Sequence, residues 1–121
     1  MAAGVWNPTI EQGATWHRVL TYLDDGQPID LTGYTARMDI VHKLSRKTAL
    51  QLDTSAGGIV IDGVAGTITL QLSAVQTATL DTYQHLYDLE LVADPDPRSA
   101  TAEVQRLVTG TITVSPQWTK P

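Results

Sequence analysis

The chain has 121 residues, a formal net charge of −5 and no cysteine. This length fits one domain with a core that needs no disulfide to hold it. The lack of cysteine excludes thiolate metal sites and cysteine nucleophiles. An acidic chain repels phosphate backbones, so we expect no nucleic acid as partner. No run approaches the roughly 20 apolar residues that span a bilayer, so we expect no membrane contact.

The first twelve residues show no regular period and contain Pro8. We interpret residues 1–12 as an N-terminal arm that becomes ordered only against another surface. Trp6 lies in this arm. A tryptophan in an irregular terminal segment either packs back on its own domain or docks on a partner.

Alternation of apolar and polar residues, typical of a half-buried strand, begins at Ala14 and runs to Leu23. Asp24-Asp25-Gly26 then favours a tight turn. Residues 34–42 alternate again and predict a second strand. The polar residues that follow predict a solvated loop, which carries the only basic cluster of the chain: His42, Lys43, Arg46 and Lys47.

The middle of the chain predicts a short strand over residues 49–53 and a hairpin over residues 59–72. Ser73 precedes Gln76 at the spacing of a capping box, so we expect one short helix over residues 73–80. Its apolar side would comprise Ala74, Val75, Ala78 and Leu80.

Two longer strands are expected over residues 84–92 and 104–114. Between them, Asp94-Pro95-Asp96-Pro97 cannot lie inside a sheet because proline lacks the backbone donor. These residues predict a polar loop that runs to about Ala102, and its role is open.

Seven or eight short strands with regularly spaced turns favour an all-β fold. We predict an antiparallel β-sandwich, immunoglobulin-like or related, with one short helix. Parallel strands would need long helical crossovers, which the sequence lacks. The domain would span residues 13–118, followed by a C-terminal tail over residues 119–121.

Two arginines fall on the apolar side of their predicted strands. Arg18 lies between Trp16 and Leu20, and Arg106 lies between Val104 and Val108. A buried, unpaired guanidinium would cost several kcal/mol. Each must therefore lie at a rim, beside a bulge, or paired with a carboxylate. A sharper hypothesis is an ion pair with a neighbouring subunit.

No catalytic motif or phosphate-binding loop is present, so we predict no catalytic, cofactor-binding or metal-binding residues and no enzyme activity. His17, His42 and His85 are far apart in sequence, and the clustered aspartates fit turns better than a calcium loop. Trp16 is assigned to packing. Trp6 and Trp118, near the chain ends, are candidate protein contacts, as are Arg18 and Arg106.

Several segments, in this order, resemble a β-sandwich domain of tailed-phage and prophage virion proteins. They are residues 11–16, 31–37, 66–73, 77–78, 87–91 and 106–116, which read EQGATW, LTGYTAR, GTITLQLS, TA, YDLEL and RLVTGTITVSP. The resemblance covers roughly residues 11–118. It implies a sandwich fold, virion assembly and multimers, and it brings no catalytic residues.

We therefore expect a virion structural protein, made in the host cytoplasm, that contacts other virion proteins as a tail, baseplate or fibre-attachment component. The expected alternatives are a head decoration protein and a carbohydrate-binding module for host recognition. A homo-oligomer is expected because virion parts form symmetric rings. Deleting residues 1–10 should weaken assembly more than folding.

Overall fold

The computed structural model describes residues 3–119, which form mostly β structure. The short strands are β1 (Gly4–Val5), β2 (Thr9–Glu11), β4 (Leu23–Asp24) and β5 (Gln27–Pro28). The longer elements are β3 (Trp16–Thr21), β6 (Thr35–His42), β7 (Thr48–Asp53), β8 (Ile59–Asp62), β9 (Thr67–Leu72), α1 (Ala74–Ala78), β10 (His85–Val92) and β11 (Val104–Ser115). Where the sequence predicts seven or eight strands, these residues form eleven, because four are too short to show a period.

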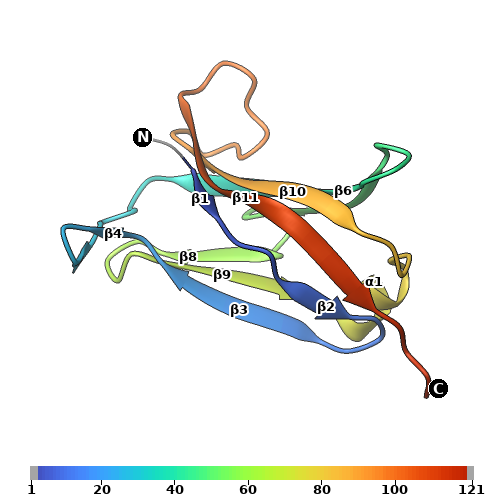
Figure 1. The fold of residues 1–121 in the computed structure, drawn as a ribbon. Coiled ribbons are helices and arrows are strands. Elements are labelled where there is room, and N and C mark those ends of the chain that lie inside the picture. Colours follow the sequence, from blue (N-terminus) through green and yellow to red (C-terminus); the bar gives the residue numbers. More distant parts are fainter. Residues whose placement is uncertain (1–2, 120–121) are drawn as a thin grey trace.

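The strands form a larger sheet, a smaller sheet and a hairpin (Figure 1). The larger sheet has the order β1-β11-β10-β6-β7, and β2 also pairs with β11. The smaller sheet has the order β3-β9-β8, and β4 pairs with β5 alone. The β4–β5 turn has positive φ at both Asp25 (50°) and Gly26 (78°), as the Asp-Gly signal predicts.

One hydrophobic core lies between the two sheets, and alternation along each strand supplies it. Along β6 the even-numbered residues from 36 to 40 are buried, and along β10 the odd-numbered residues from 85 to 91 are buried. The smaller sheet contributes Trp16, Ile59, Ile68, Leu70 and Leu72 to the same cluster. Period-two patterns therefore select the buried face of β6 and β10, as predicted.

The N-terminal arm predicted over residues 1–12 is wrong for residues 4–11, which belong to the larger sheet. β1 and β2 both pair with β11 in parallel, and Ile10 is fully buried in the core. The Trp6 carbonyl accepts a 2.6 Å hydrogen bond from the Tyr87 hydroxyl. Burial raises the pKa of Tyr87 to about 12, which keeps that donor protonated. Residues 1–2 of the arm lie outside the described residues.

This pairing also corrects the expectation of a purely antiparallel fold. The first and last strands lie side by side, and the rest of the domain connects them. A dedicated helical crossover is therefore unnecessary. Residues 120–121 of the predicted tail lie outside the described residues.

Helix α1 has the predicted capping box, but its buried face differs from the prediction. The Ser73 hydroxyl accepts from the Gln76 backbone, and the Gln76 side chain accepts from the Ser73 backbone. Thr77 is buried, whereas Val75 is exposed. The Thr77 hydroxyl donates to the Ala14 carbonyl at 2.8 Å, so a polar contact fixes the helix rotation.

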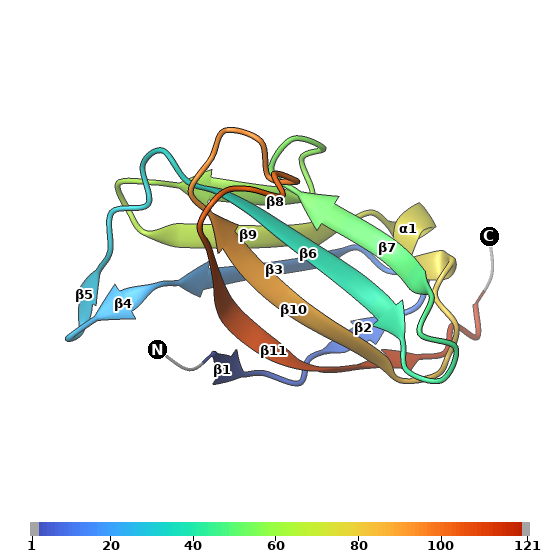
Figure 2. The same ribbon diagram turned by 90° about the horizontal axis from the view of Figure 1, so that it is seen from above.

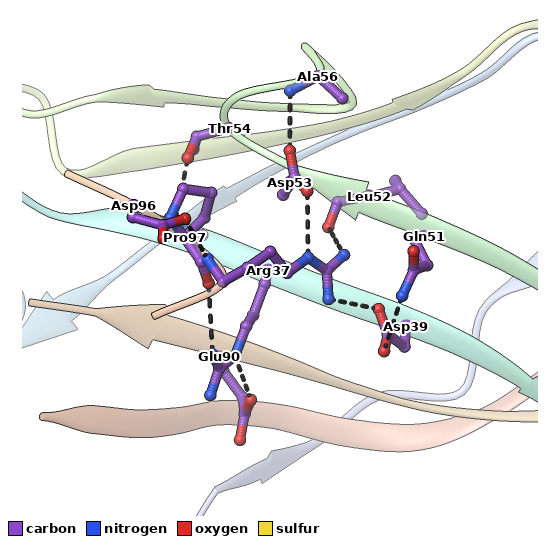
Figure 3. A network of polar contacts seen from close by, with 12 residues as sticks. Arg37, Asp39, Gln51, Leu52, Asp53, Thr54, Ala56, Glu90, Asp96 and Pro97 are labelled. Carbon is purple, nitrogen blue, oxygen red and sulfur yellow. Dashed lines mark hydrogen bonds and ion pairs between the residues drawn. The ribbon is translucent and has the colours of Figure 1, made fainter. Parts of the chain in front are cut away.

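The loop of residues 93–103 joins β10 to β11 at the end where β6 begins, and Figure 3 shows the network of polar contacts next to it on β6 and β7. Arg98 contacts Asp39 at 2.8 Å, Asp53 at 3.1 Å and the Leu52 carbonyl at 3.4 Å. Arg37 pairs with Glu90 at 2.8 Å and donates to the Pro97 and Ser99 carbonyls. Two arginines thus hold a loop whose role the sequence leaves open.

The pKa of the Asp53 carboxyl reflects these contacts. Burial alone would raise this pKa, but hydrogen bonds from the Ala56 amide and Arg98, together with the Arg98 charge, lower it below its usual value. Asp53 therefore stays ionised and remains a partner for Arg98 over the ordinary pH range.

Ile10→Ala should lower the free energy of unfolding by about 2–5 kcal/mol, because it removes a fully buried side chain from the core. The matched control, Val5→Ala in the exposed strand β1, should change stability by less than about 0.5 kcal/mol. Urea denaturation of both variants measures the difference. Equal midpoints would mean that residues 4–11 dock on the domain without supporting it.

Arg98→Ala should release the loop of residues 93–103 and cost about 1 kcal/mol, because a partly exposed ion pair contributes little more than its hydrogen bonds. Hydrogen–deuterium exchange of that loop should accelerate. Arg106→Ala is the control, since Arg106 is more exposed and pairs with Asp88 alone. Unchanged exchange in Arg98→Ala would show that the loop holds its place without the arginine.

Candidate interaction surface at the α1 end

Antiparallel pairing gathers four separate segments at one end of the molecule. Strands β6, β9 and β11 finish where β3 and β10 start, as the pairs Trp16–Leu72 and His42–His85 show. Figure 2 places α1, the β6–β7 turn and the C-terminal segment on the same side. We call this the α1 end and define it as residues 12–15, 43–47, 73–84 and 116–119.

Large apolar side chains are exposed at the α1 end. Trp118 is 88% exposed, and Val75 on α1 is 77% exposed. Leu44 in the β6–β7 turn and Tyr83 before β10 are exposed as well. These four residues come from three segments of this end, and we call them the α1-end cluster. Exposed apolar groups collected from several segments are typical of protein contact surfaces.

Gln12 joins the segments of this end to each other. Its side-chain nitrogen donates to the Leu80 carbonyl at 2.8 Å, and its side-chain oxygen accepts from the Gln117 amide at 3.1 Å. Gly13 has a φ of 80°, and a Cβ there would overlap the Gln117 side chain. The glycine therefore adopts this positive φ without strain and leaves room for the Gln117 side chain.

Thr77 adds a second connection between these segments. Its hydroxyl accepts from the Gly13 amide at 3.0 Å while it donates to the Ala14 carbonyl. Thr77 is completely buried, so water does not compete for these bonds. The loop before β3 and the helix therefore form one unit at the α1 end.

The β6–β7 turn is held by His42. The His42 Nδ1 atom accepts from the amides of Leu44 and Ser45 at 3.2 and 3.3 Å, which places the ring proton on Nε2. Nε2 lies 3.4 Å from an Asp81 carboxylate oxygen. The ring also stacks on Tyr83 with centroids 5.1 Å apart. The β6–β7 turn, which carries the exposed Leu44, and the loop before β10 therefore support each other.

His85 lies under this turn and is 1% exposed. Its Nδ1 atom lies 2.9 Å from the Tyr83 carbonyl and donates to it, whereas Nε2 is buried without a hydrogen-bond partner. Burial lowers the pKa of His85, and the neighbouring His42 lowers it further, although the Tyr83 carbonyl and Asp81 oppose this shift. The neutral ring is the form that the folded protein accommodates.

Two of the four predicted contact residues carry aromatic rings. Trp118 is exposed at the α1 end, as a contact residue would be. Trp6 instead packs on its own domain, with its ring stacked 6.2 Å from Trp16 and edge-on to Tyr87. Of the two readings that the sequence leaves open for Trp6, packing on its own domain is the one observed.

The two predicted arginines lie apart from the α1-end cluster. Arg18 is exposed, with its guanidinium 5.7 Å from the centre of the Trp16 ring. Arg106 pairs with Asp88 of the same chain at 3.3 Å. A register shift in the β10–β11 pairing lies next to Arg106, so its side chain faces outward. Rim and bulge positions thus account for both charges, as the sequence-based reasoning allows.

The outer face of the larger sheet has an open hollow of about 460 Å³. Asp39 and Asp88 lie opposite each other there on paired strands. Burial raises the pKa of Asp88, and Glu90 raises it further. Within residues 3–119, no group of three or more histidine or acidic residues is arranged to hold a metal ion.

A scan against models of known protein families matches none of them, and a search of curated proteins returns no similar sequence. Across residues 3–119, helices long and apolar enough to cross a bilayer are lacking.

Sequence reasoning misses Leu44, Val75 and Tyr83 as members of the α1-end cluster. Leu44 stands in a polar loop, and an apolar residue there is the one signal that could have identified it. Val75 is misassigned to the buried face because the buried position belongs to Thr77. Their grouping depends on pairings between distant strands, which a local period does not contain.

His85→Leu should reduce the dependence of stability on pH between about 7.5 and 5. The pKa of His85 is lower in the folded than in the unfolded chain, whose value is 6.5, so the unfolded chain binds the proton first. Stability is therefore complete above pH 6.5 and falls as the pH drops below it.

Thermal melting of the wild type and of His85→Leu over this pH range measures how the stability of each changes with pH. Titration of carboxylates affects both proteins equally and cancels when the two are subtracted. Identical slopes for the two proteins would show that His85 does not contribute.

Proposed function

We propose that this chain is a structural protein of a phage particle and acts through protein–protein contacts, as a tail, baseplate or fibre-attachment component. The proposed fold is an immunoglobulin-like β-sandwich. The sheet order β11-β10-β6-β7 opposite β3-β9-β8, with the first strands beside the last, supports it. The resemblance of residues 11–118 to virion sandwich domains supports the particle assignment.

The observation that carries the proposal is the exposed apolar cluster at the α1 end. This α1-end cluster comprises Leu44, Val75, Tyr83 and Trp118. Tryptophan and tyrosine dominate the binding energy of many protein interfaces because they bury large surfaces with few rotatable bonds. A virion component must hold its neighbours through such surfaces.

The connections beneath the cluster support a role in binding. Gln12 and Thr77 join segments of the α1 end by hydrogen bonds, and His42 connects the β6–β7 turn to the segment before β10 through Asp81 and Tyr83. A surface that is ordered before binding loses less conformational entropy when the partner arrives. A weak contact of this kind gains strength when a particle repeats it in a symmetric ring.

Trp118→Ala should lower the number of copies in purified particles while the melting temperature stays unchanged. Truncating an interface tryptophan costs about 2 kcal/mol or more of binding free energy, about 30-fold in affinity. Quantitative mass spectrometry of particles grown on a host that supplies the variant measures the copies.

Val60→Ala, on the outer face of the smaller sheet, is the matched control and should be incorporated normally. A wild-type chain that is missing from particles would overturn the proposal. So would full incorporation of both variants.

A further inference from the structure

Charge is sorted between the two ends of the molecule. The turns and loops opposite the α1 end are residues 23–34, 63–66 and 93–103, and we call them the β4–β5 end. Figures 1 and 2 both place the β4–β5 hairpin and the β8–β9 turn on that side. Its acidic residues include Asp25, Asp30, Asp62, Asp94, Asp96 and Glu103.

These six carboxylates take part in none of the ion pairs found in residues 3–119. Asp30, Asp62 and Asp96 accept hydrogen bonds from backbone amides of their own turns. Amides stabilise a carboxylate but leave its charge in place. The one arginine of this end, Arg98, is occupied by Asp39 and Asp53.

The α1 end has the opposite character. Lys43, Arg46 and Lys47 are exposed in the β6–β7 turn, and none of them forms an ion pair within the described part of the chain. Asp81, at the same end, faces His42. The basic turn stands beside the apolar α1-end cluster.

The two ends are too far apart to neutralise each other. The eight-residue strands β6 and β10 separate them, and at about 3.3 Å per residue this is roughly 25 Å. Screening in physiological salt acts over about 8 Å. Each end therefore presents its charge to other molecules.

We propose that the partner of the α1 end is the β4–β5 end of a second copy of this chain. The basic turn of one copy faces the carboxylates of the next, and exposed apolar residues are present on both sides. At the β4–β5 end these are Leu23, Tyr34 and Val64. This inference rests on the proposed function, since it names the partner of the same surface.

A head-to-tail contact is the arrangement that these charges favour. A contact between two β4–β5 ends would place six carboxylates against six others, and a contact between two α1 ends would place the two basic turns against each other. Like charges would repel in both cases. Contact between unlike ends leaves a free end of each kind, so copies add until a ring closes or a filament grows.

Sedimentation velocity of the full chain tests the contact. In about 50 mM salt the mass should rise above the 13.1 kDa monomer as concentration increases, and about 500 mM salt should reverse the rise. A monomer at every concentration and salt level would overturn the proposal. A dimer of fixed size that salt does not affect would overturn it too, because it indicates contact between like ends.

A charge exchange gives the sharper test. The α1-end variant carries Lys43→Glu and Lys47→Glu. The β4–β5-end variant carries Gln27→Lys, Asp30→Lys, Asp62→Lys, Asp96→Lys and Glu103→Lys, so that five lysines outnumber the three carboxylates that remain. Each variant alone presents the same sign at both ends and should stay monomeric, whereas an equimolar mixture should associate again. Melting curves establish that both variants fold.

Failure of this inference is distinct from failure of the proposed function. A mixture that stays monomeric overturns the head-to-tail contact, while loss of Trp118→Ala from particles would still support a virion role with another protein as partner. Charge-dependent association of a chain that never enters particles would support the head-to-tail contact and overturn the virion role.

Discussion

Antiparallel pairing is the constraint on which the surface of this protein depends. Each long strand that runs toward the α1 end is paired with one that runs back, so the connections lie at one end or the other, and the link from β7 to β8, which both run away from the α1 end, is the exception to their alternation. The basic turn follows β6 and the helix follows β9, which brings both to one end. The acidic turns fall at the other end by the same rule. A charge pattern that looks scattered along the chain thereby becomes two poles in space.

The sequence predicts this framework well where the alternation of apolar and polar residues continues along a whole strand. Strands β6, β9 and β10 show clear alternation and bury the side that their pattern indicates, whereas β11 does so only at Ile112 and Val114. The Asp-Gly turn and the capping box are also confirmed, because both depend on neighbouring residues only. The all-β class follows from these local signals, whereas the pairing partners of the short strands do not.

Prediction fails where structure depends on distant partners. Residues 4–11 contain two strands of two or three residues, and their parallel pairing with β11 is about a hundred positions away in sequence. Ile10 is fully buried because of that pairing and not because of any local period. The loop that contains Arg98 is a similar case, since Asp39 and Asp53 lie 59 and 45 residues away. Proline positions indicate that the loop leaves the sheet but not where it settles.

The candidate surface depends both on local sequence signals and on contacts between distant residues. Trp118 can be proposed as a contact from its place near the chain end, but its placement beside the helix segment depends on Gln12 and Thr77, which connect distant parts of the chain. These hydrogen bonds order the backbone of the segments that carry the exposed side chains. An end that is both ordered and apolar can bind with little loss of entropy, while an unpaired charge beside it selects which partner approaches. If the α1 end is the contact surface that we propose, stability and recognition depend on the same few connections there, and a change in those connections should affect both.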